Sequence, residues 1–245
     1  MSDGPRVDTA ALREALADPA LPDDPVDAGA VAPLGAGRVD PVTHELVFSM
    51  LLWEAPRDRA RRGMEKLCDT FVDCNEMRVC VPTEITAELG TRYPRARDRS
   101  ERLIGSLRAL AAAFPGLELS ELRNIDKREA RRVLGEIDQL PEFVRSRILL
   151  LGLGAHAIPV DGKTGRALAK AGFVRGPWDP DAIATTLERA VRSAESVWFH
   201  TKLEHWLDAR GTDAKRERRE DGGGATPEIV GTRPDPARPR KGGDA

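Results

Sequence analysis

Asp161 is the residue whose type and position are best suited to chemistry. It follows Pro159 and Val160 at the end of an apolar run, and the residues after it predict a helix that ends near Gly172. A carboxylate just before a helix is held rigidly, because it accepts hydrogen bonds from the free N–H groups of the first turn. If such a carboxylate faces a cleft, it can stabilise an oxocarbenium-like sugar or orient water while a glycosidic bond breaks. Aspartate is also a common cap wherever a helix begins, so an ordinary structural cap is the alternative interpretation.

The other residue types that could form a reactive or metal-binding site are wrongly spaced. Neighbouring cysteines have five residues between them, which is not the spacing of a zinc site. An odd number of cysteines argues against a disulfide framework and for a reducing cytoplasm, so we expect free or buried thiols. His200 and His205 are five residues apart, not the four that would align them for a metal. We therefore expect no metal and no cofactor; the cysteines are Cys68, Cys74 and Cys80.

Helices must position Asp161, because no convincing alternation of apolar and polar residues predicts a strand. Residues 45–55 (ELVFSMLLWEA) predict a strongly apolar, central helix. Residues 95–114 predict a helix with one apolar face and one arginine-rich face. The stretch 140–161 (LPEFVRSRILLLGLGAHAIPVD) predicts a short turn, a buried helix and then the aspartate. The expected fold class is all-α.

Both ends of the chain differ in composition from the middle. Residues 1–40 carry eight acidic and three basic residues, and residues 212–245 contain almost no apolar residue. We expect both ends to be disordered, because they cannot bury enough surface to offset the entropy of ordering. The net charge of the whole chain is −2, of which residues 1–40 contribute −5 and residues 212–245 contribute +1, so residues 41–211 carry a net charge of +2. Because this charge is small, any nucleic-acid site must be a local patch. No 18-residue apolar segment is present, so we expect no membrane partner.

Four segments between residues 41 and 211, in this order, resemble the helix-hairpin-helix (HhH-GPD) DNA glycosylase superfamily that includes endonuclease III. The segment HELVFSMLLWEA (44–55) is similar to the family's helix that ends in LLSAQ, and LPEFVRSRI (140–148) is similar to the family's hairpin LPGVG-x-K-T-A. The segment VDGKT (160–164), which contains Asp161, is similar to VDTHV. The segment EHWLDARG (204–211) is similar to HHWLxxHG. The resemblance implies a two-lobed, all-α fold in which a cleft meets double-stranded DNA. The lobes expected from it are 58–155 and 41–57 plus 156–211.

The resemblance also implies an activity in base-excision repair. We expect a monofunctional DNA N-glycosylase, a hydrolase that flips a damaged or mismatched base from the duplex and releases it with Asp161 as the essential carboxylate. The lysine that forms a Schiff base in bifunctional members is Ser146 here, so lysine-dependent strand cleavage is not expected. No cysteine follows Gly211, so the iron–sulfur cluster of endonuclease III is not expected either. We expect a monomer in the cytoplasm, associated with the nucleoid.

The hairpin departs from the family pattern. In the family its N–H groups hold a DNA phosphate, and glycines allow the close approach. Glu142 and Val144 occupy the two glycine positions, whereas Arg145 and Arg147 are either phosphate-binding or solvated arginines at a helix start. The residues expected to contact DNA are Leu140, Pro141, Glu142, Phe143, Val144, Arg145, Ser146 and Arg147.

Three further residues are candidates for the base pocket. Trp53 is either a stacking platform or a buried residue at the end of a core helix. Glu54 matches the glutamine of LLSAQ after a shift of one residue, and without that shift the glutamine position is Ala55. Lys163, two residues after Asp161, could supply an amine.

A second hypothesis belongs to a different functional class. The chain could be a non-catalytic helix-hairpin-helix protein that binds DNA or a protein partner. Glu142, Val144 and Ala55 favour it, as does the near-neutral charge of residues 41–211, whereas Asp161 in its Pro-Val context favours catalysis. A third hypothesis, a helical scaffold with only fold-level similarity, would be excluded by a strongly salt-dependent affinity for DNA.

Overall fold

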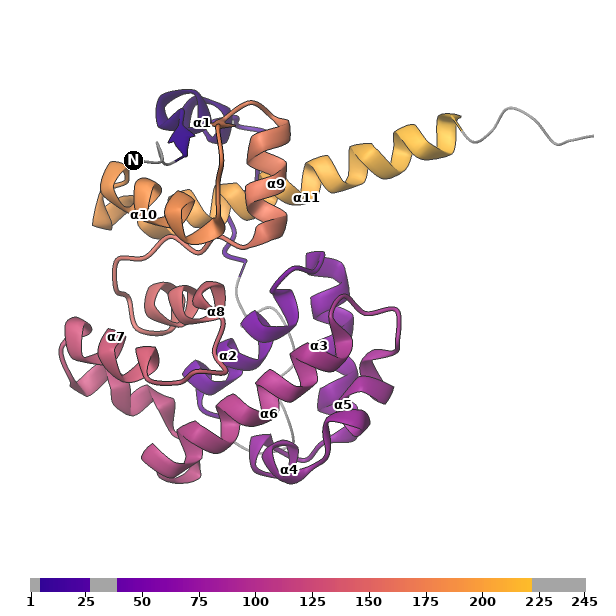
Figure 1. Ribbon diagram of the computed structural model, residues 1–245, viewed down its shortest axis with the longest axis vertical. Helices are drawn as coiled ribbons and strands as arrows, with labels where there is room; N and C mark the ends of the chain where they lie inside the picture. Colours follow the sequence, from indigo (N-terminus) through magenta and orange to yellow (C-terminus); the bar gives the residue numbers. More distant parts are fainter. Residues whose placement is uncertain (1–4, 27–38, 222–245) are drawn as a thin grey trace, which may run out of the picture. The chain divides into compact units, whose positions relative to one another are not determined.

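The chain folds into α-helices with one short β-ribbon (Figure 1), so the all-α prediction is confirmed. The computed structural model describes residues 5–26 and 39–221, with the backbone alone for residues 211–221. Residues up to Gly211 belong to one compact unit, and a second unit begins at Thr212. The α-helices are α1 (Thr9–Leu16), α2 (Pro41–Leu52), α3 (Arg57–Thr70), α4 (Cys74–Val79), α5 (Pro82–Leu89), α6 (Ala96–Ala113), α7 (Lys127–Gly135), α8 (Glu142–Arg147), α9 (Gly162–Lys170), α10 (Pro180–Ala190) and α11 (Ser196–Asp221).

Short elements complete the description. A π-helical segment, η4 (Ile148–Gly152), continues α8, and the 3-10 turns are η2 (Pro115–Leu117), η3 (Leu119–Asn124) and η5 (Ser193–Glu195). The strands β1 (Arg6–Val7) and β2 (Val174–Arg175) pair antiparallel, with Arg6 opposite Arg175.

Helix α2 is the centre of a first hydrophobic core, which contains buried residues between positions 42 and 157. Asp40 caps α2 by accepting hydrogen bonds from the N–H groups of Val42 and Thr43, both at 2.9 Å. Every residue from Val42 to Leu52 is buried. The expectation that 41–57 belongs with 156–211 is therefore wrong for α2, because a helix that is apolar on most of its faces needs neighbours all round. Helices α3, α6 and α8 supply them (Figure 1).

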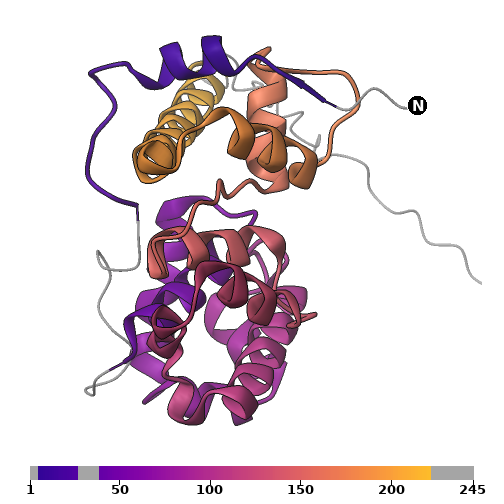
Figure 2. The same cartoon turned by 90° about the vertical axis from the view of Figure 1, so that its left-hand side faces the viewer.

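A second hydrophobic core contains side chains from α9, α10, α11 and, unexpectedly, from the N-terminal segment. Leu12 and Leu16 of α1 are fully buried in it, and Asp8 caps the helix by accepting a hydrogen bond from Ala11 N at 3.0 Å. Further along the segment, Lys202 Nζ of α11 donates to Leu21 O at 2.6 Å. Figure 2 shows α1 at the second core, close to α11.

The prediction of a disordered tail over 1–40 is thus wrong for residues 5–26. The low apolar content of the whole tail conceals one amphipathic segment, TAALREAL, whose leucines are four residues apart and face the same side. The C-terminal prediction is also wrong for residues 212–221, where α11 continues through a segment rich in Lys, Arg and Glu. The remaining parts of both predicted tails, 1–4, 27–38 and 222–245, lie outside the described residues.

Leu12→Ala is expected to lower the free energy of unfolding by about 2–5 kcal/mol, because it removes a fully buried leucine side chain and leaves a cavity. Urea unfolding measures this change. Glu14→Ala, at an exposed position of the same helix, is the control and should leave the unfolding midpoint nearly unchanged. A Leu12→Ala protein as stable as the wild type would show that α1 does not belong to the folded core.

Candidate functional site

Asp161 is the N-cap of α9 and at the same time a link to a distant segment. Its Oδ1 accepts hydrogen bonds from Thr164 N and Thr164 Oγ1, both at 2.8 Å. Its Oδ2 accepts one from Glu54 N at 2.6 Å. The residue is 2% exposed. Asp161 therefore caps α9 and also connects two parts of the chain that are 107 residues apart.

The partner segment is the turn of residues 53–55 between α2 and α3. Glu54 has a φ of 56°, in the left-handed region that a residue with a side chain adopts only under local constraint. Helix α9 supplies that constraint through Asp161 and through two cations. Lys163 Nζ donates to Ala55 O at 3.1 Å, and Arg166 Nη2 donates to Glu54 Oε2 at 2.5 Å.

The carboxylate of Glu54 lies over the first residue of α9. A Cβ atom on Gly162 would be 2.4 Å from Glu54 Oε1, so glycine is what allows this close approach. Glu54 and Lys163, two of the three predicted pocket residues, thus lie next to Asp161.

Trp53, the third predicted pocket residue, is 9% exposed and packs into the first core. Arg95 lies over its ring, 4.1 Å from the ring centroid, and Arg102 lies at 5.6 Å. Trp53 is therefore mostly a core residue, and two arginines lie over its ring.

Arg99 is a residue of this region that sequence reasoning missed. It is fully buried, and its guanidinium donates to Met50 O and Trp53 O at the end of α2 and to Pro94 O at 3.1 Å. Burial lowers its pKa to about 10. Nearby, Tyr93 Oη donates to Leu51 O at 2.8 Å, and burial raises the pKa of this phenol to about 12.

Together these donors satisfy carbonyl groups that the end of α2 leaves free, and so they help to hold the 53–55 turn. One sequence signal could have identified Arg99. It is four residues before Leu103 and eight before Leu107, so it lies on the apolar face of α6, whereas the other arginines of that run lie on the polar face.

The predicted hairpin is a plain helix start rather than a glycine turn. Helix α8 begins directly after Pro141, and no residue from 136 to 147 has a positive φ. Arg145 braces this turn, because it pairs with Glu142 and donates to Leu134 O at 3.1 Å and to Leu140 O at 3.3 Å. Pro141, Glu142 and Arg145 are half-buried, while the other predicted DNA contacts are buried: Leu140, Phe143, Val144, Ser146 and Arg147.

The interpretation of Arg147 as a phosphate-binding or solvated residue is wrong. Its side chain is 0% exposed and donates only to interior groups. These include Glu45 Oε1 at 3.0 Å, Ser49 Oγ at 2.9 Å, Val26 O at 2.7 Å and the ring Nε2 of His200 at 2.7 Å. A charge that is fully desolvated and paired in this way is a structural element.

Ser146, in the position of the Schiff-base lysine, is buried as well. Its hydroxyl donates to Glu142 Oε1 at 3.3 Å.

The sequence predicts that His200, His205 and the three cysteines do not bind a metal ion. Among the described residues no group of three or more His, Cys, Asp or Glu side chains is arranged to hold a metal ion. His205 Nε2 donates to Asp24 O at 2.8 Å. The three cysteines are free thiols, and burial raises the pKa of Cys74 to about 12. No helix in the described ranges is long and apolar enough to span a membrane.

His200 makes the stability of the fold depend on pH. Burial and the charges of Arg147 and Lys163 lower its pKa well below the usual value. The folded chain thus keeps His200 neutral, whereas the unfolded chain binds a proton below about pH 6.5. The contribution of His200 to stability is therefore full above that pH and is lost as the pH falls, by about 1.4 kcal/mol per pH unit.

Urea unfolding of wild type and His200→Gln at several pH values below about 6.5 tests this expectation. The variant should lose the part of the pH slope that corresponds to one proton. Equal slopes in the two proteins would mean that His200 titrates normally in the folded state.

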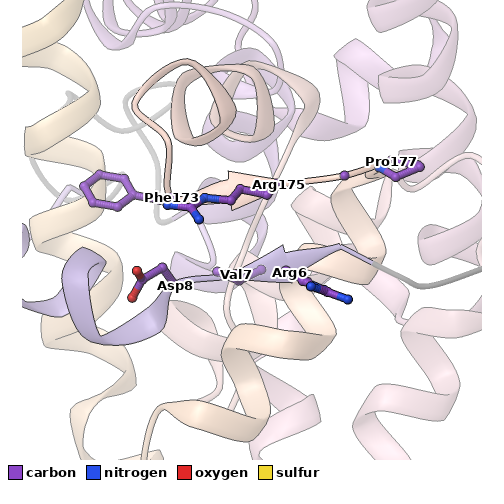
Figure 3. A pocket seen from close by; sticks show the side chains of 7 residues that line it. Arg6, Val7, Asp8, Phe173, Arg175 and Pro177 are labelled. Carbon is purple, nitrogen blue, oxygen red and sulfur yellow. The ribbon is translucent and has the colours of Figure 1, made fainter.

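A surface hollow of about 480 Å³ lies elsewhere, beside the β1–β2 ribbon (Figure 3). Phe173, Arg175 and Pro177 line it from the segment after α9, opposite Arg6 and Asp8. The hollow is thus near the C-terminal end of α9. Asp161 is at the N-terminal end of this nine-residue helix, about 13 Å away along the axis, so the hollow is separate from the site around Asp161.

The chain is similar to known proteins in its three-dimensional structure. No protein-family model and no curated protein sequence matches the chain. Among solved structures, a non-covalent endonuclease III–DNA complex is similar with a TM-score of 0.56 and 14% identity over 80% of this chain and 82% of that one. A trapped endonuclease III–DNA covalent intermediate gives 0.52 and 15%, over 72% and 77%. Clostridium acetobutylicum 8-oxoguanine glycosylase/lyase bound to DNA gives 0.52 and 13%, over 69% and 59%.

Identities this low establish the architecture alone. The order of the helices, the capped Asp161 and these three structures agree with the resemblance found in the sequence. This chain has the fold of the endonuclease III-like helix-hairpin-helix DNA glycosylases.

Proposed function

We propose that this protein is a monofunctional DNA N-glycosylase of base-excision repair that acts as a monomer on double-stranded DNA in the cytoplasm. The observation that carries the proposal is the position of Asp161. In a glycosylase fold, the aspartate that follows Pro-Val caps α9 and is hydrogen-bonded at 2.6 Å to the turn that ends α2. A carboxylate held by three hydrogen bonds is preorganised, which is what electrostatic stabilisation of a developing positive charge requires.

The reaction proposed for Asp161 is hydrolysis of the bond between a flipped base and C1′ of its sugar. The C1′–N bond breaks, its electron pair leaves with the base, and the positive charge that develops on the sugar is stabilised by the carboxylate. Water then adds to C1′, and the proton that it loses ends on the departed base, so that the products are the free base and an abasic sugar. Position 146 carries a hydroxyl instead of an amine, and the Lys163 amine donates to Ala55 O, so the proposed reaction includes no imine with the sugar.

Base release from a panel of duplexes with damaged or mismatched bases tests the proposal. Wild type should release a base from at least one duplex, and the strand should break only after alkali is added. Strand cleavage without alkali would contradict the monofunctional assignment. In that case Lys163→Gln would test whether this amine is responsible.

A second candidate function, DNA binding without chemistry, is favoured by one observation. Asp161 is 2% exposed, and the Glu54–Arg166 ion pair lies beside it over Gly162. Catalysis requires the carboxylate to gain access to a sugar, for which the 53–55 turn must shift when DNA binds. If no duplex in the panel loses a base while wild type still binds DNA, the non-catalytic function is the correct one.

A further inference from the structure

The predicted hairpin has no excess of positive charge with which to attract a phosphate. Arg145 is engaged by Glu142 and by backbone carbonyls, and Arg132 at the end of α7 pairs with two glutamates. The exposed side chains of the turn itself include the acids Glu136 and Asp138. Like charges repel, so a phosphate approaching this turn meets a surface that disfavours it. If the chain acts on DNA, another surface must supply the attraction.

Two exposed arginines, Arg95 and Arg166, and the half-buried Arg102 lie around the 53–55 turn, and we refer to the three as the turn arginines. Arg95 and Arg102 extend from the start of α6 and lie over the ring of Trp53. Arg166 extends from α9 to the carboxylate of Glu54. The three side chains are 47%, 32% and 64% exposed, so each has donors in contact with solvent.

Two carboxylates face the three turn arginines. Asp98 is shared, since Arg95 approaches it at 2.7 Å and Arg102 at 2.9 Å. Glu54 pairs with Arg166. Three guanidinium groups against two carboxylates leave one net positive charge. Surface ion pairs of this kind are weak, so a DNA phosphate can replace a carboxylate as the partner of an arginine.

The turn arginines are also close to the candidate catalytic group. Arg166 and Asp161 both bond to Glu54, and Trp53 is the residue directly before Glu54 in the chain. A hollow of about 600 Å³ adjoins them on the α6 side. It is lined by Thr86, Thr91, Tyr93, Arg95, Ala96, Arg97, Asp98 and Glu101. Arg97 in this hollow is paired with Glu101, so the hollow itself adds no net charge.

From this geometry we infer that the turn arginines bind the phosphates of duplex DNA on either side of the nucleotide presented to Asp161, in place of the hairpin. This inference rests on the proposed function but concerns binding, which is measured without base release. It also assigns a role to the two carboxylates. Asp98 and Glu54 occupy the arginines in the free protein and compete with phosphate for them.

Opposite effects of basic and acidic substitutions test the inference. The probe is a short labelled duplex that contains a stable abasic-site analogue, and the measurement is Kd by fluorescence anisotropy over a series of salt concentrations. Arg102→Gln and Arg166→Gln should each weaken binding several-fold at low salt and reduce the slope of log K against log salt by about 0.9. Glu54→Gln and Asp98→Asn should tighten binding, because each removes an anion that competes with phosphate.

Arg132→Gln is the matched control. Arg132 is 57% exposed, is ion-paired with surface carboxylates as the turn arginines are, and lies at the hairpin end of α7. Its substitution should leave Kd and the salt slope unchanged. Circular dichroism and thermal unfolding of every variant confirm that the fold is intact.

Each of the other outcomes overturns the inference. If Arg132→Gln weakens binding as much as Arg166→Gln, the hairpin end holds the DNA. If the acidic variants weaken binding along with the arginine variants, these residues serve the fold rather than the ligand. If no variant changes Kd while base release persists, the inference fails and the proposed function stands. If wild type binds no duplex, both fail.

Discussion

Asp161→Asn is expected to lower the rate of base release by a factor of about 10² to 10³, the loss usually seen when one preorganised electrostatic group is removed from an active site. The amide has nearly the shape of the carboxylate but carries no negative charge, so it cannot stabilise a cationic sugar. Single-turnover release of base from the best substrate of the panel measures the effect.

The same substitution should also destabilise the fold, for a reason specific to this site. Asparagine caps a helix about as well as aspartate, so the hydrogen bond from Thr164 N can be kept. The other end of the amide would then turn its NH₂ group toward Glu54 N, which donates to Asp161 Oδ2 at 2.6 Å. Two donors cannot bond, so a half-buried N–H group loses its partner, at about 1 kcal/mol in the free energy of unfolding.

Asp179→Asn is the matched control for Asp161→Asn. Asp179 caps α10 by accepting a hydrogen bond from Ala182 N at 3.0 Å, and it is exposed. Its exchange should change neither stability nor base release. An Asp161→Asn protein that releases base at the wild-type rate would remove the carboxylate from the mechanism. One that loses activity and is as stable as wild type would show that the Glu54 bond is not made in solution.

Arg147→Met is expected to destabilise the fold by about 3–5 kcal/mol, the usual cost of removing one member of a buried ion pair. The substitution deletes the donors to Ser49 and to Val26 O, and it leaves the carboxylate of Glu45, which is 4% exposed, without the charge of Arg147. Val26 belongs to the N-terminal segment, so the docking of residues 5–26 should loosen in the same variant. Urea unfolding measures the first effect, and limited proteolysis of the N-terminal segment measures the second.

The double variant Glu45→Gln/Arg147→Met separates charge from packing. A neutral amide at position 45 costs less to bury than a carboxylate that has lost the charge of Arg147, so the double variant should regain part of the lost stability. Arg132→Met, at an exposed ion pair of α7, should unfold like wild type. If Arg147→Met were as stable as wild type, the buried network around Arg147 would not be present in solution.

The helices and the cap at Asp161 could be predicted from the sequence because they depend on neighbours a few residues away. The apolar period of α2 and α6, the proline after Leu140 and the aspartate before α9 each act locally. The resemblance added Glu54 and Lys163 as pocket candidates, and both lie beside Asp161 in the structure.

The roles of the arginines could not be predicted in this way. Arg145 and Arg147 occur in a run that is equally compatible with a solvated face or a DNA-binding face, because the residue type carries the same charge in either setting. Arg147 is internal because its partners Glu45 and His200 are 102 and 53 residues away. No periodic pattern contains that information.

The sequence by itself thus determined the helical class, the position of Asp161 before α9 and the altered hairpin, since each depends on residues adjacent in the chain. Only the tertiary structure decided that residues 5–26 join the second core, that Arg147 is interior, and that Glu54 bonds to both Asp161 and Arg166. The physical reason is that burial and pairing are made between segments about a hundred residues apart, where a side chain's environment depends on the whole fold rather than on its neighbours in sequence.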